Sequence, residues 1–195
     1  MHTKKTQQSI QTRAVLEATA RELFETRGFS AVSSEEIVGK AEVTRGALYH
    51  HYDGKEGLFE AVVEEAMREL HNKIIRGADA GADPIDAIKQ GLRRFLELSA
   101  APRTQRLLFV DAPAVLGWQR WRAMDQRYGL GLLTGAVKNA VSQGRIQSGS
   151  PEVLAHLLMS ACIEAAMLMA NARDKRKVRT EAERALVRLV DGICA

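Results

Sequence analysis

A short run in the N-terminal third carries side chains that can bind an anionic, hydrogen-bonding partner. It begins with Thr44, Arg45 and Gly46, and Tyr49 and His50 follow about one turn later on a predicted helix. The N-terminus of a helix favours phosphate, and a guanidinium there can bind phosphate or guanine. Gly46 weakens a helix without benefit unless a group such as phosphate approaches its backbone closely. The structural alternative makes Thr44 a helix cap and Arg45 a solvated charge.

Two further polar residues lie just beyond this run. Lys55 begins a predicted helix, where the helix dipole favours acids, so an external anion would relieve the mismatch. We expect Tyr52 to pack inward and to offer its hydroxyl to a phosphate, with a simple core aromatic as the alternative. His50 and His51 are adjacent and face different ways on a helix, so we predict no metal site there.

The chain lacks the patterns that usually carry catalysis. It has no glycine-rich phosphate loop after a strand, no His/Cys cluster with metal-ligand spacing and no nucleophile elbow. Its five histidines are scattered along the chain at His2, His50, His51, His71 and His156. We therefore predict a protein that is not an enzyme and that uses no cofactor or metal.

Composition restricts the class of protein only loosely. The 195 residues are 46% hydrophobic and carry a formal net charge of +4. Residues 1–55 hold eight Lys/Arg against seven Asp/Glu, so net charge alone does not establish nucleic-acid binding. Cys162 and Cys194 are too few for a disulfide framework and suit a reducing cytosol. Because Met1–Gln8 lacks the apolar run of a signal peptide, we predict a cytoplasmic protein.

Helices are the elements that position the N-terminal polar residues. Apolar residues recur at helical spacing over 11–27, and a capping box at 33–36 opens a short helix that ends near residue 41. A second short helix follows over 44–50, and a long one runs over 55–76. Two short helices joined by a tight turn are typical of a helix-turn-helix, whose second helix lies in the major groove of DNA.

Helical patterns continue through the rest of the chain, and no alternating strand of useful length appears. The predicted elements are a helix opened by Asp83-Pro84, a shorter element between Pro102 and Pro113, long helices over 118–144 and 151–172, a solvated loop over 173–179 and a last helix opened by a capping box at Thr180. We expect an all-α protein of about nine helices. Residues 1–54 would form the helix-turn-helix domain, and 55–195 a second domain entered through the connector helix 55–76.

The run from Gly28 to Leu58 resembles the TetR (tetracycline-repressor-like) family. The matching residues are Leu23-Phe24, Gly28-Phe29, Ser33, Ile37, Ala41, Val43-Thr44-Arg45-Gly46, Leu48-Tyr49-His50, Tyr52 and Lys55-Glu56-Gly57-Leu58. They cover about the first third of the chain at fixed spacing. The DNA-binding residues predicted from the motif and the resemblance are Ser33, Thr44, Arg45, Gly46, Tyr49, His50, Tyr52 and Lys55.

The resemblance implies an all-helical C-terminal ligand domain whose last two helices pair into a dimeric four-helix bundle. The sequence departs from the family pattern at two positions. Glu42 replaces the usual turn glycine and would cost about 1–2 kcal/mol if the turn needs a left-handed backbone. Gly54 precedes Lys55 where Asp, Asn or Ser is common, and it is a weaker helix cap.

The C-terminal part contains candidates for an effector pocket. Aromatic and methionine side chains could frame an apolar pocket between helices, with ordinary core packing as the alternative. These candidates are Phe95, Phe109, Trp118, Trp121 and Met159. His156, Ser160 and Glu164 form a polar stripe on the 151–172 helix, which fits either a subunit interface or the pocket lining. We expect Glu164 or His156 to anchor the effector, so Glu164 completes the predicted ligand-binding set.

The 151–172 helix is apolar on most sides. A membrane span is disfavoured because His156, Ser160, Glu164 and Asn171 interrupt it, and a charge at mid-bilayer is costly. Burial in the core and at a subunit interface explains the composition instead.

Together these features predict a ligand-responsive transcriptional regulator, most simply a repressor. It would bind palindromic double-stranded operator DNA as a homodimer through its last two helices, and a small hydrophobic effector would release it. Two alternatives stay open: a DNA-binding regulator without a ligand, and a helical module whose helix-turn-helix contacts protein.

Overall fold

The computed structural model of the chain describes residues 4–77, 82–147 and 149–194. Within these ranges the secondary structure is helical, apart from one isolated bridge between Ile146 and Cys194. Adjoining segments merge into nine continuous helical stretches. One cluster of buried apolar side chains extends from Leu16 to Val190. The prediction of an all-α fold is confirmed.

The N-terminal part consists of α1 (Lys4–Arg27), α2 (Ser34–Lys40) and α3 (Arg45–Tyr52). Both short helices have the predicted caps: the Ser33 hydroxyl accepts from the Glu36 N–H, and the Thr44 hydroxyl accepts from the Ala47 N–H, each at 3.1 Å. The three helices enclose a small apolar core that includes Leu16, Phe24, Ile37 and Leu48. The turn between α2 and α3 contains Glu42 with φ of 53°, so the strained backbone suspected at this position is present.

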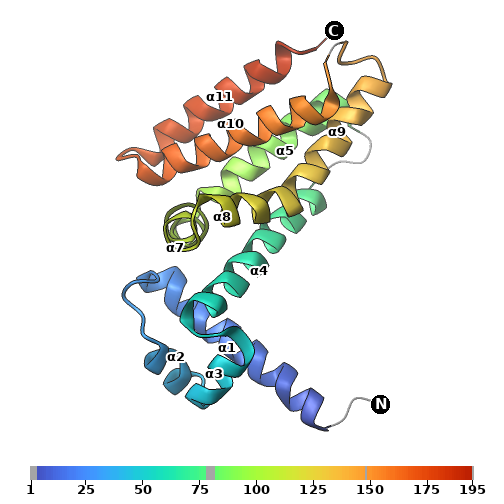
Figure 1. Cartoon of the computed structure of the whole chain (residues 1–195). Helices are drawn as coiled ribbons and strands as arrows, with labels where there is room; N and C mark the ends of the chain where they lie inside the picture. Colours follow the sequence, from blue (N-terminus) through green and yellow to red (C-terminus); the bar gives the residue numbers. More distant parts are fainter. Residues whose placement is uncertain (1–3, 78–81, 148, 195) are drawn as a thin grey trace.

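Helix α4 (Lys55–Arg76) runs from the N-terminal part into the C-terminal part (Figure 1). Gly54 gives it no side-chain cap, as predicted, and has φ of 101°. Helices α3 and α4 approach closely at Gly57, where a Cβ atom would lie 1.7 Å from the Tyr52 carbonyl oxygen. This contact requires glycine at position 57 and fixes the start of α4 against the end of α3.

The C-terminal part is a bundle in which α10 and α11 pack side by side (Figure 1). Its elements are α5 (Pro84–Ser99), α6 (Pro102–Thr104), η1 (Gln105–Asp111), α7 (Ala112–Leu116), α8 (Trp118–Asp125), η2 (Gln126–Leu130), α9 (Gly131–Ser142), α10 (Pro151–Asn171) and α11 (Lys175–Asp191). Segments η1 and η2 are π-helical, whereas the sequence predicted regular helix there. Such segments are rare and often occur at functional sites.

Two predicted helix starts need correction. Helix α11 begins at Lys175 and not at Thr180, because the Asp174 side chain caps it by accepting from the Lys177 N–H at 2.9 Å. The Thr180 hydroxyl instead donates to the Arg176 carbonyl inside the helix, so most of the predicted loop over 173–179 is helical. Helix α1 likewise begins at Lys4, several residues before the predicted start at Gln11.

Helix α10 is, among the described residues, the one helix long and apolar enough to cross a membrane by length and composition alone. That criterion is weak for a single helix, since core helices of soluble proteins also satisfy it. Here α10 packs against α5, α9, α11 and η1, and buries Ala155, Met159, Cys162 and Ala166 among other residues. The packing accounts for the apolar residues on the inner face of α10, whereas Val153, Leu157 and Leu168 on its outer face are exposed.

Candidate nucleic-acid interface and effector cavity

Helix α3 has one buried face and one exposed face. Leu48 and Tyr52 are buried against α1 and α4, whereas the polar run on the other side of the helix faces solvent. The exposed residues of this run are Thr44, Arg45, Gly46, Tyr49 and His50. A Cβ atom at Gly46 would meet nothing closer than the Thr44 hydroxyl at 3.8 Å, so a ligand can approach this backbone.

Arg45 and Tyr49 lie together on the exposed face. The Arg45 guanidinium carbon lies 5.6 Å from the centroid of the Tyr49 ring, and its Nη1 lies 3.2 Å from Glu35 Oε1. Tyr49 is 47% exposed, which is high for an aromatic side chain in a folded domain. Both side chains can therefore reach a partner that docks against α3. Such docking would break only the exposed ion pair between Arg45 and Glu35, which contributes little to stability.

Tyr52 does not lie as the prediction requires. The side chain is only 8% exposed, and its hydroxyl donates to Glu17 Oε1 at 2.6 Å. Burial is the main cause that raises the pKa of Tyr52 to about 12. The inward packing predicted for Tyr52 is present, and its hydroxyl proton is already donated to Glu17, so a phosphate contact would require that hydrogen bond to break.

Lys55 also has a different environment from the predicted one. Its ammonium donates to the carbonyl oxygens of Phe29 at 3.1 Å and Val32 at 2.8 Å, and it lies 3.9 Å from the centre of the Phe29 ring. These contacts hold the loop between α1 and α2 in place. They satisfy the charge from within the protein, so the mismatch with the helix dipole needs no external anion.

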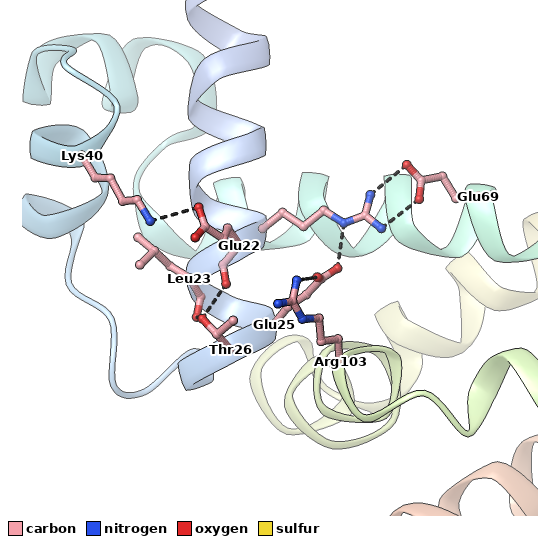
Figure 2. Close-up of polar contacts among 8 residues, drawn as sticks. Glu22, Leu23, Glu25, Thr26, Lys40, Glu69 and Arg103 are labelled. Carbon is pink, nitrogen blue, oxygen red and sulfur yellow. Dashed lines mark hydrogen bonds and ion pairs between the residues drawn. The ribbon is translucent and has the colours of Figure 1, made fainter.

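The end of α1 is linked by polar contacts to several other helices (Figure 2). Glu22 accepts from Lys40 of α2 at 3.0 Å, and Arg103 of α6 lies 3.8 Å from Glu25. The Arg21 guanidinium donates to both carboxylate oxygens of Glu69 in α4, each at 2.8 Å. These contacts join the N-terminal part to α4 and to the start of the C-terminal bundle.

A cavity of about 170 Å³ lies between α4, α5, η2, α9 and α10. Of the six predicted ligand-binding residues, Phe95 and Met159 line it. Most of the remaining wall is aliphatic, including Ile74, Ile88 and Leu133. The cavity is thus apolar and lies between helices, as predicted, although its wall differs from the predicted one.

The other four predicted residues lie outside this cavity. Trp121 is fully buried, and its indole N–H donates to the Leu108 carbonyl at 2.7 Å. Phe109 packs edge-to-face against Trp121 in the same core, whereas Trp118 is 53% exposed. Glu164 is exposed on α10, as is His156, so neither can anchor a ligand in the cavity. Core packing, the alternative given for the aromatic residues, accounts for Phe109 and Trp121, because aromatic type alone does not distinguish core packing from cavity lining.

Two buried ionisable residues of the cavity wall were not predicted from the sequence. His71 of α4 is 6% exposed and Asp125 of α8 is 5% exposed, and both line the cavity. Burial lowers the pKa of His71, and burial raises the pKa of Asp125 to about 7 despite the nearby Arg122. His71 follows Met67 by four positions and precedes Ile74 by three, so the helical pattern itself placed it on the core face of α4.

The comparisons with known proteins match this architecture. Residues 16–62 match the bacterial regulatory proteins of the tetR family, and residues 85–193 match the tetracyclin repressor-like C-terminal domain. The transposon Tn10 TetC protein of Escherichia coli is 26% identical over 140 residues, which are 72% of this chain and 71% of TetC.

Two solved structures are also similar. A TetR-family transcriptional regulator from Pectobacterium atrosepticum is 31% identical, with a TM-score of 0.87 over 100% of this chain and 98% of the other. RolR in complex with resorcinol has a TM-score of 0.75 at 21% identity over 94% of this chain and 89% of the other, which shows a shared fold. The extent of both family matches and the structural match over the full length lead to one conclusion: this chain belongs to the tetR family of bacterial regulatory proteins.

Proposed function

We propose that this transcriptional regulator is a repressor that binds a two-fold symmetric operator as a homodimer and is released by a small apolar effector. The observation that carries the proposal is the exposed face of α3, where Thr44, Arg45, Gly46, Tyr49 and His50 lie free of the core. A recognition helix needs such a face, because its N-terminal residues must reach base edges and phosphates in the major groove.

The environment of each side chain refines the DNA contacts. Ser33 is exposed, and its hydroxyl proton is free to reach a phosphate while its oxygen caps α2. At the start of α4, a phosphate would bind the backbone N–H groups and not the Lys55 ammonium. Gly54 leaves the first N–H groups of this helix without a side-chain cap, so they are available to bind an anion. Tyr52 would act indirectly, by holding α3 against α1.

The homodimer is supported by the outer face of α10 and α11. Large apolar side chains are exposed there at Val153, Leu157 and Leu168 of α10 and at Leu189 of α11. Exposed apolar residues at helical spacing indicate an interaction surface. The polar stripe of His156, Ser160 and Glu164 lies on the exposed side of the same helix, which favours its assignment to the interface over the pocket.

The effector is supported by the apolar cavity in the C-terminal bundle, a usual location for small-molecule sites. RolR, which shares the fold, was solved with resorcinol. A cytoplasmic location and a domain boundary between residues 54 and 55 complete the proposal. A ligand-independent regulator is the second candidate, and it predicts that no small molecule changes operator binding.

The experiment is to select bound fragments from genomic DNA of the source organism and to measure affinity for the recovered operator by fluorescence anisotropy. Arg45→Ala and Tyr49→Ala should each weaken specific binding by about 1–3 kcal/mol. Arg145→Ala is the matched control, because Arg145, like Arg45, is an exposed cation in one ion pair. It belongs to the segment between α9 and α10, which lies at the opposite end of the molecule from α3 (Figure 1). Unchanged affinity in both folded α3 variants would remove α3 as the reader of the operator.

A further inference from the structure

The cavity has the size of a site for one small ring. Its volume of about 170 Å³ is close to that of an engineered apolar cavity of about 150 Å³ that binds benzene. Apolar side chains from four helices, α4, α5, α9 and α10, form most of its wall. Two buried ionisable groups, His71 and Asp125, interrupt this lining.

The hydrogen-bonding state of His71 follows from its contact with the backbone. Its Nδ1 lies 2.8 Å from the Met67 carbonyl oxygen, which can only accept, so Nδ1 carries the proton. Burial lowers the pKa of His71 and keeps the ring neutral at pH 7. The second nitrogen, Nε2, is then an acceptor.

Asp125 faces His71 across a short gap. Its Oδ2 accepts from Arg122 Nη1 at 3.2 Å, whereas its Oδ1 lies 3.9 Å from His71 Nε2. That separation is too long for a hydrogen bond. An oxygen atom placed beside this pair, about 2.8 Å from each of the two atoms, would lie within hydrogen-bond distance of both groups.

Gly129 of η2 lies close against His71. A Cβ atom at this position would lie 2.5 Å from His71 Nε2 and 3.2 Å from the end of the Met159 side chain. Any larger residue would therefore push against the imidazole where its acceptor atom lies. His71 and Asp125 thus lie beside Gly129 in a mostly apolar cavity, whose lining also includes Gln90 and Arg94 of α5.

We propose that the effector is a neutral compound about the size of one ring that carries a hydroxyl group, as a phenol does. The hydroxyl donates to His71 Nε2, and its oxygen accepts a hydrogen bond from the protonated carboxyl group of Asp125. A full charge on the ligand is disfavoured by the mostly apolar wall. This inference rests on the proposed function, since it names the class of molecule that the cavity takes.

The test measures binding to the dimer by calorimetry in the absence of DNA, with 4-methylphenol and 1,4-dimethylbenzene as probes. The two probes have nearly the same shape and differ in the hydroxyl. The ratio of their affinities in His71→Leu, divided by the same ratio in the wild type, cancels their different partitioning from water. We expect the affinity of His71→Leu for 4-methylphenol to fall at least about tenfold relative to its affinity for 1,4-dimethylbenzene.

Cys162→Ala is the control, because Cys162 lines the same cavity and burial raises the pKa of its thiol to about 12, which leaves it a weak hydrogen-bonding partner. The ratio should stay within about twofold in this variant. If His71→Leu fails to fold, Asp125→Leu replaces it and should lower the ratio at least severalfold.

If the affinity ratio of the two probes is unchanged in the folded variant, the proposal is wrong. It is also wrong if neither probe binds the wild type at millimolar concentration. Operator binding, measured on the same preparations, reports separately on the proposed function. If the protein binds its operator but neither probe, the proposed regulatory function stands and the proposal of a hydroxyl-bearing effector is wrong.

Discussion

Asp125 is a carboxyl group held in surroundings that favour its neutral form. Only 5% of the residue is exposed, and burial outweighs the attraction of Arg122, so that its pKa rises to about 7. The same burial lowers the pKa of His71. Keeping both groups uncharged in the empty cavity has a cost in stability that depends on pH.

Asp125→Asn should remove the part of this pH dependence that belongs to the carboxyl group. Between about pH 4 and pH 7 the native protein keeps a proton on Asp125 that the unfolded chain has lost, so rising pH destabilises the wild type. Relative to Asp125→Asn, the free energy of unfolding of the wild type should fall by about 2–4 kcal/mol over this range.

The measurement is urea unfolding at several pH values and at one protein concentration, because dimers gain stability with concentration. Asp86→Asn changes an exposed aspartate in the first turn of α5 and serves as the control. If the difference in free energy of unfolding between the wild type and Asp125→Asn stays constant over this pH range, the raised pKa of Asp125 is contradicted.

Individual residues could be predicted from the sequence where local chemistry decides their position. Thr44 and Ser33 cap their helices as expected, because capping depends on neighbours within the same turn. Tyr52 and Lys55 differ from expectation because their partners, Glu17 and the Phe29 carbonyl, lie far away in the sequence. Asp125 was missed because it reaches the cavity beside the π-helical segment η2, where regular helical spacing no longer applies.

At the scale of elements, η1 connects the two parts of the molecule. Asp111 at its end accepts a hydrogen bond from the Phe29 N–H at 2.9 Å, just beyond the end of α1. Arg106 donates to the Thr26 carbonyl, and the Leu108 carbonyl accepts from Trp121 of α8. A shift of η1 would therefore move the end of α1 and with it the support of α3.

Asp111→Ala should loosen this connection. The change leaves the partly buried Phe29 N–H without its acceptor, which costs about 1–3 kcal/mol. The free energy of unfolding should fall by this amount, and amide hydrogen exchange at Phe29 should accelerate. Asp111→Asn retains an acceptor oxygen and should lose much less; equal losses in the two variants would show that this hydrogen bond does not hold η1 to α1.

Element boundaries could be predicted where an apolar face or a cap marks them. The starts of α2, α5 and α10 carry clear signals, namely Ser33, Asp83-Pro84 and Ser150-Pro151. The first turns of α11 are charged and exposed, so no apolar pattern distinguished them from a loop. The relative placement of α4, α5 and α10 around the cavity depends on contacts between distant segments, which single-sequence periodicity does not contain.

At the scale of the whole molecule, α10 and α11 lie on the side of the bundle away from α4 (Figure 1). The connector α4 links the bundle to the helix-turn-helix, so a dimer formed through α10 and α11 would set the distance between its two α3 helices. Operators with two half-sites tolerate little error in that distance. A ligand in the cavity contacts both α4 and α10, and it can act by favouring one separation over the other.

Leu157→Glu should break this dimer. Leu157 is 63% exposed on the outer face of α10, and a carboxylate there would face its counterpart or apolar surface in the paired helices. Sedimentation equilibrium should show a dimer for the wild type and a monomer for the variant at micromolar concentration, with lost affinity for the two-fold operator. Val110→Glu is the control, since Val110 is 43% exposed on η1, outside α10 and α11. A wild type that sediments as a monomer would contradict the homodimer, and a Leu157→Glu variant that remains dimeric would place the interface elsewhere.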